Sequence, residues 1–310
     1  MQRDDFFPVA RASCGQRVQE LLEIASDNNR KKKVGMSESK ASEAPSTTSH
    51  TFDEAVALEP VAGRLRGHTH EAYWNMVSPF GGLTAAVALN GLLLQSERSG
   101  DPVSFTVNYV APIQRGEFFV EPQLLRSSRS TQHWSVQIVQ GDEVTASAIA
   151  IFGARRPTWS LTEAAPPQTP GPEESVRFTP PRNLMRWPEM YDIRYARGTV
   201  RTENADSLTH SWIRDAQPRA IDYLSLAAFC DTFAPRLLFR RPLFVPLGTV
   251  SLNIYFHVDA AELASHGTEP VLGVAYGQVF HKGYFDQQAQ VWGKDGRLLA
   301  TTQQVVWFKE

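Results

Sequence analysis

The chain has 310 residues, which allows two ordinary domains at about 150 residues each. Its 31 lysines and arginines against 33 aspartates and glutamates leave a formal charge of −2, which argues against an electrostatic DNA or RNA binder. Only Cys14 and Cys230 are present, too few for a disulfide scaffold and without zinc-ligand spacing. The composition therefore predicts a cytoplasmic protein with no nucleic-acid partner and no metal.

The longest apolar stretch, residues 83–94, contains Asn90 and is shorter than the roughly 20 residues needed to cross a bilayer. The start of the chain carries Asp4 and Asp5 and has no continuous apolar core, so it resembles neither a secretory signal nor a transit peptide. We therefore predict no membrane partner.

Residues 1–48 differ in composition from the rest of the chain. A short helical pattern at residues 18–24 precedes a basic run at residues 30–33, and Ser, Thr, Ala and Glu follow. This composition predicts a weakly structured tail whose basic run is solvated, and Met36 offers an alternative start.

Prolines divide the remainder of the chain. Seven of them gather between Pro157 and Pro181 and predict a linker over residues 157–181. The linker separates an N-terminal block, residues 49–156, from a C-terminal block, residues 182–310.

The N-terminal block opens with a strand-like lead-in. Pro79-Phe80-Gly81-Gly82 then begins an apolar helix that is predicted to run to about Glu97. Four strand-like runs follow, with a hairpin turn at Gly141-Asp142 between the last two: residues 103–111, 117–126, 134–140 and 143–152.

The C-terminal block repeats this order. Strand-like runs at residues 191–197 and 208–213 lead into a helix predicted over residues 220–238. Four strand-like runs follow, with a turn at Lys294-Asp295-Gly296 before the last: residues 249–257, 271–280, 285–292 and 297–308.

Residue patterns support an internal repeat. Residues 104–108 and 249–253 share the order hydroxyl, apolar, hydroxyl, apolar, Asn, and the final strands match at residues 144–147 and 298–301. Each block therefore predicts one long helix wrapped by a curved antiparallel sheet, an α+β fold without βαβ alternation.

Several common catalytic and cofactor-binding motifs are absent from the sequence. The sequence has no Gly-x-Ser-x-Gly elbow, no phosphate loop and no Gly-x-Gly-x-x-Gly fingerprint, so no cofactor is predicted. His68 and His70 fall on one face of a predicted strand without a third ligand, which favours surface histidines over a metal site. Cys230 has no adjacent base and is predicted to be a core residue.

One carboxylate stands out in the second helix. Asp231 falls at helical spacing from Leu224, Ala227 and Ala228, and therefore on the apolar stripe. A buried carboxylate needs hydrogen-bond partners or a raised pKa, which makes Asp231 a candidate general base. The alternative is that Asp231, near the helix end, reaches solvent or an arginine.

Neutral hydrogen-bonding residues on the strands could hold this carboxylate. Thr249, Ser251 and Asn253 are predicted to share one face of their strand, and Gln304 follows Thr302 on one face of the last strand.

The two blocks differ in chemistry. The N-terminal block has Asn90 where the C-terminal block has Asp231, and Ala150 aligns with Gln304. It keeps Phe80-Gly81-Gly82, whose glycines would let a ligand approach the helix N-terminus and its unpaired N–H groups.

At these motifs the chain resembles the double hotdog acyl-CoA thioesterases, close to the type II enzymes, over residues 51–310. The resemblance rests on the Phe-Gly-Gly helix start and three other segments, at residues 52–55, 255–257 and 295–304. It implies acyl-CoA as substrate, a role in fatty acid metabolism, and further association into a homo-oligomer.

The resemblance also implies roles for individual residues. Asp231, Thr249 and Gln304 would hold the attacking water, and the backbone N–H groups of Gly81 and Gly82 would stabilise the oxyanion next to Phe80. The acyl chain would lie in an apolar tunnel between helix and sheet. The residues that bind the CoA phosphates stay open among Arg126, Arg129, Arg155 and Arg156.

Two alternatives remain at this stage. An enoyl-CoA hydratase or dehydratase would share the fold, but its Gly-Asp-x-Asn-Pro-x-His motif is absent. An acyl-CoA binding or sensing module would keep the tunnel without turnover.

Overall fold

The computed structural model describes residues 49–180, 185–200, 202–241 and 243–310. The predictions for the tail at residues 1–48, including its basic run and Met36, lie outside the described residues.

Four long antiparallel strands form the sheet of the N-terminal block, at the predicted places. Along the last of them Ala146, Ala148, Ala150 and Phe152 are buried in alternation with more exposed residues, as a sheet with one covered face requires. The strands are β5 (Asp101–Tyr109), β6 (Glu117–Ser127), β7 (Thr131–Gln140) and β8 (Glu143–Gly153). Gly141 at the β7–β8 turn has φ +62°, a conformation that favours glycine.

The strands of the C-terminal block also follow the prediction, with one difference. The predicted run at residues 271–280 ends at Tyr276, and a separate short strand begins at Phe280. The strands are β10 (Tyr191–Arg197), β11 (Thr209–Asp215), β12 (Leu247–Phe256), β13 (Val271–Tyr276), β14 (Phe280–His281), β15 (Tyr284–Trp292) and β16 (Leu298–Phe308). A further strand, β9 (Val176–Arg177), lies in the predicted linker and pairs with β10.

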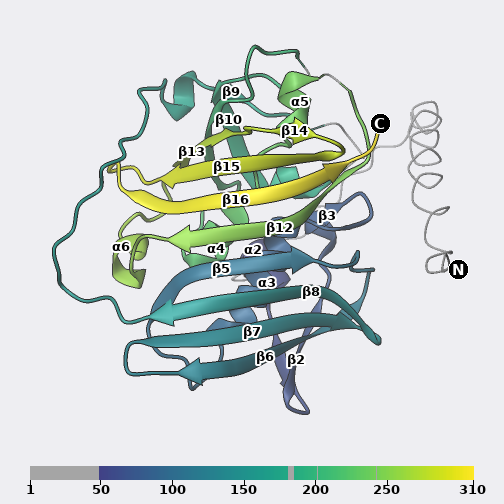
Figure 1. The fold of residues 1–310 in the computed structure, drawn as a ribbon, viewed down its shortest axis with the longest axis vertical. Coiled ribbons are helices and arrows are strands. Elements are labelled where there is room, and N and C mark those ends of the chain that lie inside the picture. The colour runs from purple at the N-terminus through teal and green to yellow at the C-terminus, as the bar shows by residue number, and fades with distance from the viewer. Residues whose placement is uncertain (1–48, 181–184, 201, 242) are drawn as a thin grey trace, which may run out of the picture. The chain divides into compact units, whose positions relative to one another are not determined.

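The strands of both blocks join into one antiparallel sheet. It begins with two strands that precede the apolar helix of the N-terminal block, β1 (Glu59–Val61) and β2 (Arg64–His68). Its order is β1-β2-β6-β7-β8-β5-β12-β16-β15-β13-β11-β10-β9, with β14 paired to β15. Figure 1 shows β5 and β12 side by side at the centre, with the helices α3 (Gly81–Leu93) and α4 (Tyr223–Phe229) behind them. Because β5 pairs with β12, residues from both blocks meet at this seam.

The apolar helix of the N-terminal block is α3 (Gly81–Leu93), which ends earlier than the predicted Glu97. It packs against β5, β6 and β7. A Cβ atom on Gly91 would lie 2.5 Å from Val120 Cγ1 on β6, so glycine allows α3 to approach the sheet closely.

The strand-like lead-in before α3 was predicted incompletely. It begins with a helix, α2 (Thr51–Val56), whose residue Phe52 is fully buried and whose N-cap is His50. The strands β1 (Glu59–Val61) and β2 (Arg64–His68) follow, with the 3₁₀ turn η2 (Glu71–Tyr73) and the hairpin β3 (Trp74–Asn75) and β4 (Ser78–Pro79).

The prediction of one long helix over residues 220–238 is wrong. The segment forms α4 (Tyr223–Phe229) and, after a break, α5 (Leu237–Arg240). Pro235 explains the break, because proline has no N–H and its ring clashes with the carbonyl of the residue four before it. The Thr232 hydroxyl donates instead to the Phe229 carbonyl and helps to end α4.

The remaining elements are short: the helix α6 (Ala260–Ala264) and the 3₁₀ turns η3 (Pro172–Glu174) and η4 (Trp187–Met190). In the predicted linker, residues 157–171 form neither helix nor strand, whereas η3 and β9 fall within residues 172–181. Among the described helices, none has the length and apolar character of a membrane span.

Candidate active site

The N-terminus of α3 lies against the end of α4. A Cβ atom on Gly81 would lie 2.7 Å from Asp231 Oδ2, and one on Gly82 would lie 2.7 Å from the Ala228 carbonyl oxygen. Both positions therefore need glycine for the two helices to meet. The first N–H groups of α3 have no acceptor inside the helix, which leaves them available to a carboxylate or a substrate oxygen.

Asp231 lies just beyond α4, not on its apolar stripe as the unbroken helix predicted. Helix α4 ends at Phe229 with Cys230 as C-cap, so Asp231 leaves the helix and turns toward α3. Its Oδ1 accepts a hydrogen bond of 2.9 Å from Gln304 Nε2. The alternative was that Asp231 reaches solvent or an arginine. Its side chain is partly exposed, but its partners are Gln304 and the Gly82 backbone, and no arginine pairs with it among the described residues.

Burial raises the pKa of Asp231 to about 7. Hydrogen bonds from the Gln304 side chain and the Gly82 backbone N–H act in the opposite direction but do not outweigh the loss of solvation. At neutral pH the carboxyl group therefore exists in both protonation states, as a general base requires.

Gln304 lies on the buried face of β16. Its Nε2 also donates to the Cys230 carbonyl at 3.3 Å, and its Oε1 lies 3.5 Å from the Thr249 hydroxyl. Because the carboxylate can only accept, the amide nitrogen of Gln304 must face Asp231. Thr302 shares the buried face with Gln304, as predicted.

A β-bulge corrects the prediction for β12. Thr249 pairs with Val306 and Ser251 with Val305, so Val250 is the extra residue. Thr249 therefore lies on the inner face with Gln304, whereas Ser251 and Asn253 lie on the opposite face. Strict alternation was the wrong assumption, because a bulge shifts every residue on one side of it to the other face.

Tyr109, at the end of β5, was missed by the sequence analysis. Its hydroxyl donates to the Gly81 carbonyl at 2.9 Å, and its ring lies 3.4 Å from the Cβ position of Gly81. Burial, together with the charge of Asp231, raises the pKa of Tyr109 well above its usual value. The only sequence signal was a tyrosine at the end of a predicted strand, which is too common to identify a site.

Three other residues named from the sequence lie in different surroundings. The Phe80 ring stacks on Trp187 with centroids 4.1 Å apart and is 2% exposed, so contact with a substrate would fall to its backbone. Cys230 is fully buried, as predicted, and burial raises the pKa of its thiol. His70 caps η2 rather than sharing a strand face with His68.

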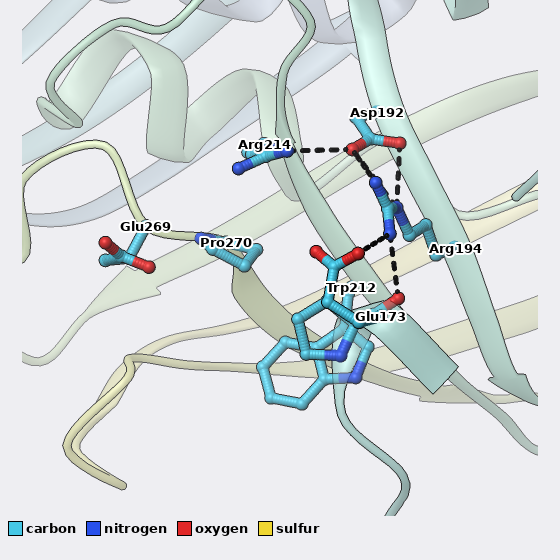
Figure 2. A pocket seen from close by; sticks show the side chains of 8 residues that line it. Glu173, Asp192, Arg194, Trp212, Arg214, Glu269 and Pro270 are labelled. Carbon is cyan, nitrogen blue, oxygen red and sulfur yellow. Dashed lines mark hydrogen bonds and ion pairs between the residues drawn. The ribbon is translucent and has the colours of Figure 1, made fainter. Parts of the chain in front are cut away.

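Two pockets formed by the described residues differ in their lining. An apolar pocket lies between α3 and the sheet of the N-terminal block, lined by Ala55, His68, Thr69, Pro79, Leu83, Thr84, Val87, Ile113, Phe118 and Ile138. A polar pocket, shown in Figure 2, is lined by Pro172, Glu173, Asp192, Arg194, Trp212, Arg214, Glu269 and Pro270. None of the predicted site residues lines the polar pocket, whose arginines and carboxylates pair with one another.

The geometry thus combines a partly buried carboxyl group of raised pKa, two neutral hydrogen-bonding side chains and the N-terminus of a helix. This combination suits attack by a base-activated water on an acyl group. Comparison with solved structures places the fold in the hotdog class. A conserved protein of unknown function with a hot dog fold from Alicyclobacillus acidocaldarius is 42% identical, with a TM-score of 0.82, and the match covers 85% of this chain and 99% of that one.

Family models define the relationship further. The acyl-CoA thioesterase N-terminal domain matches residues 70–153, and the acyl-CoA thioesterase C-terminal domain matches residues 162–308. The chain therefore belongs to the acyl-CoA thioesterase family and is an acyl-CoA thioester hydrolase. Comparison with curated proteins gives no significant match.

More distant solved structures share the fold. The tesB protein of Mycobacterium avium subspecies paratuberculosis is 16% identical, with a TM-score of 0.70 over 84% of this chain and 98% of that one. An acyl-CoA thioesterase II from Mycobacterium marinum is 18% identical, with a TM-score of 0.65 over 83% of this chain and 98% of that one.

Proposed function

We propose that Asp231 is the general base of the thioester hydrolysis. The observation that carries this proposal is a carboxylate with a pKa of about 7 that lies at the N-terminus of α3 and is held by Gln304. Asp231 takes a proton from water as the water oxygen bonds to the thioester carbon. The C–S bond then breaks, and the proton passes from Asp231 to the departing thiolate.

Thr249 and Gln304 orient the attacking water. Both side chains lie on the inner face beside Asp231, and both are neutral, so they lower the basicity of the carboxylate less than a cation would. The backbone N–H groups of Gly81 and Gly82 stabilise the oxyanion at the positive end of α3. The Gly82 N–H bonds to Asp231 while the carboxyl group is ionised, and it becomes available to the oxyanion as Asp231 takes the proton.

The acyl chain enters the apolar pocket of the N-terminal block, whose volume of about 10 Å³ requires the lining side chains to move apart to admit hydrocarbon. Pro79 and Leu83, which flank the Gly81-Gly82 helix start, line its near end, and Val87 lies one helical turn further along α3. The chain would thus extend away from Asp231 between α3 and the sheet. Apolar linings of this kind bind hydrocarbon without specific polar contacts.

We also propose that residues 49–156 and 182–310 are two copies of one hotdog unit, joined by residues 157–181. The β5–β12 seam supports this: Thr106 pairs with Asn253, and Asn108 pairs with Ser251. In the repeat alignment Thr106 corresponds to Ser251 and Asn108 to Asn253, so the seam pairs equivalent residues in reverse order. That is the pattern of a local two-fold axis.

A cytoplasmic location, a role in fatty acid metabolism and association into homo-oligomers belong to the same proposal. The scarcity of cysteine supports the location. Exposed apolar side chains on the outer face of the sheet, among them Val305 and Trp307, support association.

The test is release of free thiol from acyl-CoAs of short to long chain, with the wild type and Asp231→Asn compared. We expect the wild type to release CoA and Asp231→Asn to lose activity by about 10² to 10⁴-fold. Binding without release by the wild type would identify an acyl-CoA binding module. Hydration of enoyl-CoA without thiol release would identify a hydratase.

A further inference from the structure

Arg236 is a buried cation with no carboxylate beside it. Its relative exposure is 0%, and the ion pairs of the described residues include none with this guanidinium. All its hydrogen-bond acceptors are neutral, and its guanidinium carbon lies 4.5 Å from the centre of the Phe239 ring. The acceptors are Ala234 O, Gln287 Oε1, Ser207 O, Thr209 Oγ1 and Ala275 O.

An unpaired buried charge is costly, and an apolar side chain of similar volume would avoid that cost. Burial lowers the pKa of Arg236 to about 10, so the guanidinium is still charged at neutral pH. The place of Arg236 in the fold indicates what the charge supports, because two separate routes lead from it to Asp231.

The first route runs along the chain. Asp231 and Arg236 are the two ends of the short segment that breaks the second helix. The guanidinium bonds back to Ala234 within this segment and forward to Thr209 on β11 and Ala275 on β13. Arg236 therefore ties the segment that carries Asp231 to the sheet.

The second route runs across the sheet. Arg236 Nε donates to Gln287 Oε1 at 3.0 Å, and Gln287 is paired directly with Gln304 on the neighbouring strand. Both glutamines are almost fully buried on the inner face. Because a guanidinium only donates, it fixes the Gln287 amide with its oxygen toward Arg236 and its nitrogen away. Gln304 in turn donates to Asp231.

We propose that Arg236 and Gln287 are positioning residues for the hydrolysis proposed above. Arg236 holds the Asp231 segment against the sheet. Gln287, fixed by Arg236, restricts the orientation of the Gln304 amide on the neighbouring strand, so Asp231 and its hydrogen-bond donor keep their relative positions. Neither residue contacts the reacting atoms. Their loss should therefore lower kcat and leave KM nearly unchanged.

Two substitutions test the constraint. Arg236→Lys keeps the charge but cannot reproduce the planar fork of donors, and Gln287→Leu removes the acceptor while keeping a similar volume. For each we expect kcat to fall about tenfold or more and KM to stay within about twofold. Arg194→Lys is the matched control, since Arg194 pairs with Asp192 and Glu173 away from the site, and it should keep the wild-type kcat.

Gln287→Glu separates positioning from general stability. The new carboxylate gives Arg236 a counter-ion, so this variant should fold and keep or raise Tm. It also places a negative charge beside Gln304, which should raise the pKa of Asp231 by about one unit. The acid limb of the kcat/KM profile should move upward by the same amount.

A second readout does not need turnover. Carbon-13 NMR of the aspartate carboxyl groups, with the Asp231 signal assigned by its loss in Asp231→Asn, follows the titration of Asp231 directly. We expect its midpoint to rise in Gln287→Leu, because a Gln304 amide that is no longer held in place stabilises the carboxylate less, and to be unchanged in Arg194→Lys. If the wild type cleaved no acyl-CoA, the proposed function would fail, and this titration would still decide the positioning roles.

The proposal is overturned if Arg236→Lys and Gln287→Leu lower Tm but keep both the wild-type kcat and the wild-type Asp231 midpoint. That result would leave Arg236 with a purely structural role. Should Arg236→Lys fail to fold, the two Gln287 variants decide the question.

Discussion

Asp231 sets the pH dependence of the proposed reaction. A general base must be ionised, and the pKa of Asp231 is raised to about 7 by burial. We therefore expect kcat/KM to rise with pH through about 7 and to level off above it. Asp215 is the natural control, because burial also raises its pKa to about 7 and it lies on β11. An acid limb that disappeared in Asp215→Asn would show that Asp231 is not the titrating base.

The Asp231 carboxylate should also lower the stability of the folded protein. An unfolded aspartate has a pKa near 3.9, whereas Asp231 has about 7, so the folded state holds the extra proton between these values. Raising the pH through this window therefore destabilises the folded protein. Asn cannot titrate, so the Tm of Asp231→Asn should exceed that of the wild type, by a margin that grows from about pH 4 to about pH 7. Thermal unfolding of both proteins across that range measures the margin.

Gly81 should be essential for activity more than for stability. Gly81→Ala would put a Cβ atom 2.7 Å from Asp231 Oδ2, and only movement of the carboxylate would relieve the contact. Because a displacement of about 1 Å can cost 10²-fold in rate, we expect a loss of kcat of that order with little loss of Tm. Gly91→Ala, which collides with Val120 instead, should lower Tm and spare kcat. Equal effects of both variants on kcat would contradict this assignment.

At the scale of elements, sequence patterns predicted the strands because their causes are local. Alternating burial and turn residues lie within each strand, and β10 begins and ends at the predicted residues. The break after α4 also had a local signal, Pro235, which the apolar periodicity masked. The bulge at Val250 had none, because it depends on the pairing of β12 with β16.

The residues of the candidate site were predicted less completely than the strands. Asp231, Thr249 and Gln304 were named through the family resemblance, and the structure brings them together at the start of α3. Tyr109 could not be found, because its contact with Gly81 joins a strand end to a helix start that are distant in sequence. Arg236 was also missed, since surface arginine is the ordinary expectation from composition.

The size of the side chain at position 87 on α3 should set the preferred acyl-chain length. Val87 lines the apolar pocket one turn beyond Leu83, so Val87→Phe would shorten the space for the chain and Val87→Ala would lengthen it. We expect the chain length with the highest kcat/KM to decrease in the first variant and increase in the second, at about 0.8 kcal/mol per methylene. Leu226→Phe on α4, outside the pocket, should leave the preference unchanged. An unaltered preference in both Val87 variants would place the acyl chain elsewhere.

At the scale of the whole molecule, an ion-pair cluster joins the segment before β9 to the sheet (Figure 2). Asp192 on β10 pairs with Arg177, Arg194 and Arg214, and Arg194 also pairs with Glu173. The Asp192 side chain is 10% exposed, so the three guanidiniums converge on a nearly buried carboxylate. Without it, the guanidiniums would repel one another, although water screens Arg177 and Arg214, whose side chains are 67% and 43% exposed.

This cluster makes the fold sensitive to acid. Burial alone would raise the pKa of Asp192, but its hydrogen bond with Arg194 and the neighbouring arginine charges outweigh burial and lower it. The stability it provides is complete above the unfolded pKa of about 3.9 and is lost as pH falls through the lower folded value. Asp192→Asn should therefore lower the unfolding free energy by about 2 kcal/mol at pH 7, and by much less near pH 3.

Urea unfolding at both pH values measures the difference. Glu173→Gln is the control, because the Glu173 side chain is 83% exposed and its pair with Arg194 should contribute little. Since the cluster lies away from Asp231, Asp192→Asn should keep the wild-type kcat at temperatures where it is folded. A fall in kcat with no fall in unfolding free energy would contradict this prediction. It would mean that the Asp192 ion pairs affect the active site and do not only stabilise the attachment of the segment before β9.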